Sequence, residues 1–385
     1  MFPSAILGRR VLVRLLAAAA TAALAQSARA GSGPPLANVP LAPPLYSIDL
    51  ASPSIGSGID ADDILAKDGP LPGPGPFEEV PNLNLGLGRP GDELNGLSGS
   101  NRKVGPGVTF AILFGVDRSS VGGAPPDPGL VGLGFPYNMQ QQAGLGQAAG
   151  DIFMATQLFD RAGPRSGLRV PNNNVLVVNQ GDAGGVDLDL VTDDPPDTPT
   201  AGPIDNKDAM GYLDNGGLRG MPTRAYFSLD RLSPSLGFLP DFSAASIFLD
   251  QNLNAGGTET LYAQSTQLGL HPQDDVDAMI VFDLNFNGFF DFGDQVIFSL
   301  TPDSPSLINC GYSPADLITT NGLQCGELYA GAETLGLLAT DNIVALELLL
   351  TGDIDASIHD HAIFPEPATC ALLLVGLGLR RRRGR

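Results

Sequence analysis

The stretch that decides the fold runs from residue 274 to residue 307 and reads DDVDAMIVFDLNFNGFFDFGDQVIFSLTPDSPSL. Two β-type runs, Ala278–Phe282 and Gln295–Leu300, flank a polar loop that contains Asn287-Gly288. Short apolar runs bounded by Gly, Asn and Asp are typical of strands joined by turns. The stretch therefore predicts a β-hairpin, and parts of it recur along the chain.

Five phrases recur in a fixed order, which indicates an internal repeat. An aromatic phrase occupies residues 46–49, 114–117, 227–230 and 298–301. Ser-Pro-Ser follows at 52–54, 233–235 and 304–306, with the weaker Ser119-Ser120-Val121 in the second copy. A small-acidic lead into a β run comes next, at 61–65, 149–153, 245–248 and 315–318. Leu-Gly-Leu stands at 85–87, 268–270 and 335–337, before acidic-apolar phrases at 92–95, 205–210, 274–279 and 341–346.

The repeats predict an all-β domain over residues 45–350, with four irregular units at roughly 45–98, 110–212, 226–283 and 297–350. Units of about four short strands suit a radial β array such as a small propeller. If each unit begins with the acidic-apolar phrase, the last strand, Ile343–Leu350, can complete the unit that Tyr46 opens. A β-sandwich and an elongated stack without closure remain as alternatives.

Residues 1–30 have the three parts of a signal peptide. Arg9, Arg10 and Arg14 form the basic part, an apolar run follows, and Ala28-Arg29-Ala30 is a small-x-small cleavage site. The segment predicts an N-terminal signal helix followed by a Pro/Gly-rich linker at 31–44. Because the paired arginines also resemble a twin-arginine signal, the general secretory route and the twin-arginine route both stay open.

A linker at 351–364 leads to a distinctive tail at residues 365–385. Pro365-Glu366-Pro367 precedes the uncharged run Ala368–Leu379. Four arginines follow the run: Arg380, Arg381, Arg382 and Arg383. The apolar run predicts a short helix, below the roughly 20 residues that cross a bilayer unaided. Arginines favour the cytoplasmic side, so we expect a transient association with the inner membrane. A plain tail anchor is the alternative.

This order of Pro-Glu-Pro, apolar run and arginine cluster resembles the PEP-CTERM sorting signal. Such signals are handled by exosortase, a membrane transpeptidase-like enzyme of Gram-negative bacteria. The resemblance covers only residues 364–385, and the apolar run is shorter than is usual and contains Cys370. It implies export, processing near the Pro-Glu-Pro triplet, and release to the cell surface or the extracellular space. Proteins with this signal typically accompany exopolysaccharide production in biofilms, so exosortase, the export machinery and extracellular polysaccharide are the expected partners.

The segment between the two signals is strongly acidic. Residues 31–364 carry 12 basic and 41 acidic residues, a net charge of −29, whereas the whole chain has −21. A surface of this charge repels nucleic acid and anionic lipid, so both are poor partners and no nucleic acid is expected to bind. It attracts divalent cations, and calcium dependence is therefore expected in an extracellular setting.

One segment, residues 283–294, matches the spacing of a twelve-residue calcium loop. Its oxygen donors would be Asp283, Asn285, Asn287, the Phe289 carbonyl, Asp291 and Asp294, with Gly288 at the sharp turn. The segment resembles a dockerin-type or EF-hand-like loop, although its flanks predict strands, so that the loop would cap a hairpin. The alternative is a metal-free hairpin in which Asn287-Gly288 forms a type I′ turn.

Two cysteines, Cys310 and Cys325, lie in the predicted exported segment. In an oxidising compartment they favour one intrachain disulfide, with two free thiols as the alternative.

No catalytic motif is present. The sequence lacks HExxH, GxSxG and a phosphate-binding glycine loop. It also contains no Trp, which weakens both a glycosidase and a stacking-type sugar-binding site. We therefore expect a non-catalytic, exported protein of the cell envelope or extracellular matrix. The alternative is an extracellular hydrolase or glycan-binding module on a propeller-like scaffold.

Overall fold

The computed structural model describes a little over half of the chain. The described residues are 44–56, 59–67, 77–80, 85–100, 111–123, 138–145, 148–155, 174–178, 205–213, 224–237, 242–251, 259–283, 285–291, 293–320 and 324–348. The predicted signal peptide, the linker at 351–364 and the tail at 365–385 lie outside these residues, as does the linker at 31–44 apart from Pro44. The two helices expected in those signals are therefore also outside the described part.

The described residues form four antiparallel sheets of four strands each. The first contains β16 (Ile343–Leu348), β1 (Pro44–Ile48), β2 (Ile64–Ala66) and β3 (Phe77–Val80). The second contains β4 (Leu94–Ser100), β5 (Ala111–Val116), β6 (Ile152–Ala155) and β7 (Asn174–Val178). The third contains β8 (Lys207–Leu213), β9 (Arg224–Leu229), β10 (Ile247–Asp250) and β11 (Glu259–Ala263), and the fourth β12 (Val276–Phe282), β13 (Gln295–Leu300), β14 (Leu317–Thr319) and β15 (Glu327–Ala330). The prediction of an all-β fold is confirmed.

Helical structure in the described part is limited to short connecting segments. These are α3 (Met139–Leu145), the 3-10 helix η2 (Pro234–Gly237), α4 (Ser265–Leu268), α5 (Pro305–Cys310) and α6 (Ala332–Leu335). None of the helices in the described ranges is both long and apolar enough to cross a membrane.

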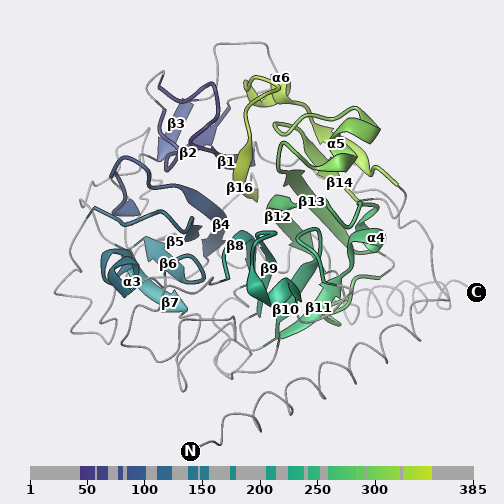
Figure 1. The fold of residues 1–385 in the computed structure, drawn as a ribbon, viewed down its shortest axis with the longest axis horizontal. Helices are drawn as coiled ribbons and strands as arrows, with labels where there is room; N and C mark the ends of the chain where they lie inside the picture. Colours follow the sequence, from purple (N-terminus) through teal and green to yellow (C-terminus); the bar gives the residue numbers. More distant parts are fainter. Residues whose placement is uncertain are drawn as a thin grey trace, which may run out of the picture.

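The four sheets lie around a common centre, with the first strand of each sheet innermost (Figure 1). These innermost strands are β16, β4, β8 and β12. Each contacts its two neighbours around the ring, and opposite members of the set also approach each other across the centre. Residues that begin an innermost strand are therefore brought together from all four sheets.

The first sheet joins the two ends of the described chain. Strand β1 pairs with β16, with Tyr46 opposite Leu346 and Ser47 opposite Ala345. This is the pairing that the phase of the repeat predicts. It places the acidic-apolar phrase on the innermost strand of each sheet and the aromatic phrase on the second.

The aromatic phrase supplies the core. Tyr46, Phe114, Phe227 and Phe298 are all at most 1% exposed. Hydrophobic clusters fill the spaces between neighbouring sheets, as where Tyr226 and Tyr262 of the third sheet pack with Phe298 of the fourth. Burial of side chains this large removes much apolar surface from water, which is the main favourable contribution to folding.

The Leu-Gly-Leu phrase ends a helical turn. Gly269 and Gly336 follow α4 and α6 in the left-handed conformation, each with φ of 78°. The flanking leucines are buried, and the second of each pair donates its N–H back to the start of the helix, as Leu270 does to Ser265 at 2.8 Å. Glycine is needed here because the helix end requires positive φ. The repeat thus encodes a helix stop followed by a core leucine.

Two residues of the repeat, Gly115 and Lys207, differ together from their equivalents in the other sheets. Ser228 and Ser299, on second strands, donate their hydroxyls to Val276 O and Ile343 O on the next innermost strand. The equivalent residue of the second sheet is Gly115, and a Cβ there would lie 2.7 Å from Lys207 Nζ. Lys207 is fully buried and donates to Asp151 O at 2.7 Å. Burial lowers the pKa of Lys207 to about 8, against the opposing effect of the Asp151 charge. The lysine end group therefore occupies the space that the serine side chain fills elsewhere.

Candidate functional site

The predicted calcium loop connects two paired strands. Phe282, at the end of β12, is opposite Gln295, at the start of β13, so residues 283–294 span the hairpin end. Leu284 and Phe292 lie outside the described residues. Gly288 has φ of 78°, and a Cβ there would lie 3.1 Å from a methyl group of Leu249. The positive φ therefore favours glycine at this position, and a larger residue would also have to displace the Leu249 methyl group.

Asp283 fixes the base of the loop. Its side chain is fully buried, and Oδ2 accepts hydrogen bonds from Tyr226 Oη at 2.9 Å and from Gly288 N at 3.1 Å. The guanidinium of Arg224 lies 3.8 Å from the same oxygen. The second oxygen, Oδ1, is buried without a hydrogen-bond partner. Burial, together with the Asp283 charge, raises the pKa of Tyr226, so this tyrosine stays a donor at neutral pH.

The exposed part of the loop holds a small polar network. Asn285 and Asn287 donate their Nδ2 groups to the two oxygens of Asp291 at 2.8 and 2.7 Å. Asp294 Oδ2 accepts from Asp291 N at 3.0 Å. Four of the predicted donors thus interact with one another, whereas Asp283 accepts from Tyr226 and Gly288, and Phe289 is 45% exposed.

The loop supplies oxygen atoms of the kind that a hard cation binds. Within the described ranges, no group of three or more His, Cys, Asp or Glu is arranged to hold a metal ion. The observation that fits a cation is the buried, partnerless Asp283 Oδ1, because such an acceptor is costly unless it is satisfied. A hard cation such as calcium would bind Asp283, Asp291 and Asp294 through oxygen.

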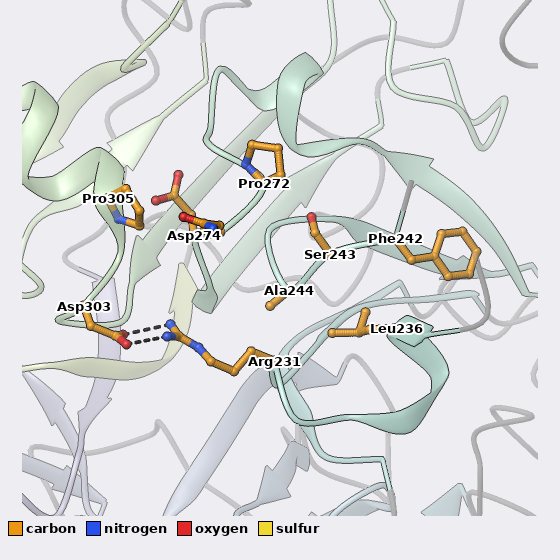
Figure 2. A pocket seen from close by; sticks show the side chains of 10 residues that line it. Arg231, Leu236, Phe242, Ser243, Ala244, Pro272, Asp274, Asp303 and Pro305 are labelled. Atoms are coloured by element: carbon orange, nitrogen blue, oxygen red, sulfur yellow. Dashed lines mark hydrogen bonds and ion pairs between the residues drawn. The ribbon is translucent and has the colours of Figure 1, made fainter. Parts of the chain in front are cut away.

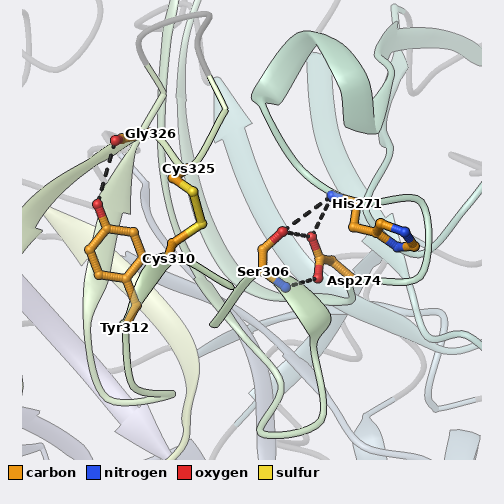
Figure 3. The surroundings of a disulfide bond; sticks show 7 residues. All are labelled: His271, Asp274, Ser306, Cys310, Tyr312, Cys325 and Gly326. Atoms are coloured by element: carbon orange, nitrogen blue, oxygen red, sulfur yellow. Dashed lines mark hydrogen bonds between the residues drawn. A yellow bond between two sulfur atoms is a disulfide. The ribbon is translucent and has the colours of Figure 1, made fainter. Parts of the chain in front are cut away.

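The disulfide predicted between Cys310 and Cys325 is present. Cys310 and Cys325 form a disulfide with a Cα–Cα distance of 5.5 Å, which connects the end of α5 to the segment before β15 (Figure 3). Cys325 N also donates, at 3.2 Å, to the carbonyl oxygen of Gly269, which follows α4 in the connection from β11 to β12. The disulfide therefore holds a turn that contacts the connection between the third and fourth sheets.

A pocket of about 480 Å³ lies between loops of the third and fourth sheets (Figure 2). Its lining residues are Arg231, Leu236, Phe242, Ser243, Ala244, Pro272, Gln273, Asp274, Asp303 and Pro305. The acids in this lining already have partners. Asp303 pairs with Arg231, and Asp274 accepts from Ser306 and His271. Among the described lining residues, no free pair of carboxylates is available for acid-base catalysis.

A fourfold network was missed by the sequence analysis. We define the inner-strand motif as residues 92–95, 205–208, 274–277 and 341–344, which lead into β4, β8, β12 and β16. The backbone N–H at its second position donates to a serine hydroxyl in every sheet, at 2.8 to 3.0 Å. These serines are Ser120, Ser233, Ser304 and Ser52.

The aspartate at the first position of the motif completes this network. Asp274 accepts from the N–H and hydroxyl of Ser306, and Asp205 and Asp341 bond Ser235 and Ser54 in the same manner. In the second sheet, Asp92 accepts instead from the N–H groups of Val121 and Gly122. The repeated Ser-Pro-Ser phrase therefore has a structural role. Because this phrase recurs together with the acidic-apolar phrase, the sequence could have suggested that the two are in contact.

No protein-family model, curated protein or solved structure matches this chain.

Proposed function

We propose that the chain is an exported, non-catalytic protein of the cell envelope or extracellular matrix that exosortase sorts. The observation that carries the proposal is the order of Pro365-Glu366-Pro367, apolar run and Arg380–Arg383. Two features of the described residues support it. The Cys310–Cys325 disulfide suits an oxidising compartment, and Asp274 and Asp303, the carboxylates described in the pocket lining, are held in hydrogen bonds with neighbouring residues.

The domain made of the four sheets is the part that we propose is exported and sorted. We infer that the four sheets form a closed, propeller-like array, with β16 completing the first sheet. A closed array leaves few exposed strand edges, which suits a protein outside the cell. Extracellular polysaccharide is the proposed partner, through the acidic surface and bridging divalent cations.

Replacing Pro365-Glu366-Pro367 with Ala-Ala-Ala should retain the protein in the inner membrane, because the processing enzyme would lose its recognition element. Fractionation of cells that express tagged wild type and variant, with and without an exosortase gene, measures this. Wild type in the exosortase-deficient strain should behave like the variant. Release of the variant at the wild-type level would contradict the sorting proposal.

A glycan-binding or hydrolytic role is the second candidate. It predicts polar residues clustered at one end of the centre, and acidic and amide side chains do gather there, as described below. They are buried, however, and bonded to one another, which favours the non-catalytic proposal. Loss of viscosity of purified exopolysaccharide on incubation with the protein would instead support hydrolysis.

We also propose calcium as a structural ion of loop 283–294. The supporting observation is the partnerless Asp283 Oδ1 at the base of a loop with three carboxylates. Binding only to the folded state adds about 2.7 kcal/mol of stability when free calcium exceeds Kd a hundredfold. Extracellular calcium modules typically have Kd near 10⁻⁴ to 10⁻³ M.

EGTA should therefore lower the melting temperature of the wild type, and Asp291→Asn should reduce that response. Differential scanning calorimetry in calcium and in EGTA measures both. Glu333→Gln is the matched control, because it removes an exposed carboxylate from α6 and should leave the response unchanged. Equal responses to EGTA in wild type and Asp291→Asn would refute calcium binding at this loop.

A further inference from the structure

Polar residues lie on both sides of the first residue of the innermost strands, with one exception. The second position of the inner-strand motif is Glu93, Asn206, Asp275 or Asn342, and the fourth is Asn95, Asp208, Asp277 or Val344. All but Val344 are acidic or amide side chains. We call the seven polar residues the central acidic cluster.

Contacts between neighbouring sheets hold this cluster together. Asn95 Nδ2, at the start of β4, donates to Asp208 Oδ1, at the start of β8, at 3.5 Å. Asp208 is within hydrogen-bonding reach of Asp275, which precedes β12. Asn342, which precedes β16, donates its Nδ2 to Asp277 Oδ2 on β12. The polar groups of all four sheets therefore meet at one end of the centre.

The negative charge of this cluster is only partly balanced. Arg231 Nε donates to Asp275 Oδ2 at 2.9 Å, but the same guanidinium also pairs with Asp303. Asp208 and Asp277 are 7% and 4% exposed. Burial, and then the charges of neighbouring carboxylates, raise the pKa of both groups well above the usual range. Burial, and then Asp49 and Asp117, raise the pKa of Glu93 to about 8. Buried like charges of this kind require a counter-charge or protons.

Three oxygen atoms of the central acidic cluster lack hydrogen-bond partners. Asn206 Oδ1, Asp275 Oδ1 and Asn342 Oδ1 are buried and have no hydrogen-bond partner. All three residues occupy the same position of the inner-strand motif in successive sheets. A buried acceptor without a donor costs about 1–3 kcal/mol. An electron-pair acceptor bound beside these three equivalent positions would satisfy them.

We propose that the central acidic cluster binds a divalent cation of the calcium class between the innermost strands. Its oxygen donors would be the carboxylates of Asp208 and Asp277 and the Oδ1 atoms of Asn206, Asp275 and Asn342. Calcium accepts six to eight oxygen ligands in flexible geometry, including carboxylates, amide oxygens and water. This donor set contains no nitrogen or sulfur, which selects against zinc and copper.

Binding would rearrange the side chains. The amides of Asn95 and Asn342 now donate to the carboxylates that would face the cation, and no three acids in the described ranges surround one point. The Asn342 amide would turn its oxygen toward the cation, and the Asn95 amide would release Asp208. The cation would then connect strands from different sheets and stabilise the ring as a whole.

The test uses Asp291→Asn protein, so that loop 283–294 contributes as little as possible to the measured calcium binding. Calorimetric titration of EGTA-treated, dialysed protein with CaCl₂ should show one bound calcium per chain and a higher melting temperature. Adding Asp277→Asn, which keeps the side-chain shape, should lower the calcium affinity at least tenfold and abolish most of the thermal shift. Asp208→Asn tests the same cation from another sheet and serves if the first variant does not fold.

Glu333→Gln in the same background is the control for charge alone, and its affinity should be unchanged. The proposal is overturned if Asp291→Asn protein binds no calcium. It is equally overturned if both Asp277→Asn and Asp208→Asn, when folded, bind calcium with the original affinity. In that case protons, not a cation, compensate the buried charge. Protein sorting is not involved in this measurement. A negative calcium result would therefore leave the localisation proposal unaffected.

Discussion

Asp274→Ala should lower the free energy of unfolding by about 3 kcal/mol, because it leaves buried donors without an acceptor. Asp274 is 1% exposed. Its carboxylate accepts from Ser306 N at 2.8 Å, from the Ser306 hydroxyl, and from His271 N at 2.6 Å (Figure 3). Hydrogen bonds to a charged acceptor are about twice as strong as neutral ones. The loss also separates the start of β12 from α5, which weakens the fourth sheet at its innermost strand.

Urea denaturation at pH 7 measures this loss. Asp303→Ala is the matched control, since Asp303 is a carboxylate of the same sheet whose side chain is 68% exposed. Exposed ion pairs contribute little, so this variant should lose less than about 1 kcal/mol. Asp274→Asn should fall between the two, because an amide oxygen still accepts but carries no charge. A loss for Asp274→Ala no larger than for Asp303→Ala would show that the network does not stabilise the ring.

Removing the disulfide should have an effect of similar size. Cys310 and Cys325 are 15 residues apart, and closing a loop of that length restricts the unfolded chain by about 3 kcal/mol. Cys310→Ser/Cys325→Ser should therefore unfold at a clearly lower urea concentration than the wild type. The double change avoids leaving one unpaired thiol in the turn between the sheets.

Reductant provides the control for this variant. Dithiothreitol should shift the wild-type unfolding midpoint to that of the double variant and should leave the double variant itself unchanged. Cys370 is present in both proteins unless the tail is removed, so it cannot account for a difference between them. A wild type that unfolds at the same midpoint with and without dithiothreitol would argue against a stabilising bond.

Local sequence patterns predicted the elements of the fold well. The aromatic phrase became the second strand of each sheet, and the acidic-apolar phrase became the innermost. Each phrase contains its own signal, such as alternating β-type residues or a glycine that ends a helical turn. The pairing of β1 with β16 was also foreseeable, because the phase of the repeat leaves one strand over at each end.

Contacts between distant residues were not predictable in this way. Ser52 accepts from Asn342 N across 290 positions of sequence, and no local pattern identifies that partner. Lys207 looked like an ordinary charged residue, yet it is buried against Gly115 of another sheet. Only the comparison of equivalent repeat positions, where Gly115 replaces serine and Lys207 replaces an apolar residue, could have suggested the exchange.

The candidate metal sites illustrate the same limit. Spacing alone identified loop 283–294, because its donors are close in sequence. It did not show that Tyr226 of another strand occupies one oxygen of Asp283. The sequence did not predict the central acidic cluster, because its members come from four segments that are distant in sequence and meet only in the folded protein.

Strand β1 pairs with β16, which is the last strand of the described chain to be synthesised. A growing chain can complete its second, third and fourth sheets in order, but the first stays three-stranded until residues 343–348 have been made. Until then β1 presents an unpaired edge, which can pair with other chains and aggregate. Such late, non-local pairing also slows folding. The pairing of β1 with β16 therefore waits until the final strand has been synthesised, and a chain truncated before that strand should keep β1 exposed and be more sensitive to proteolysis.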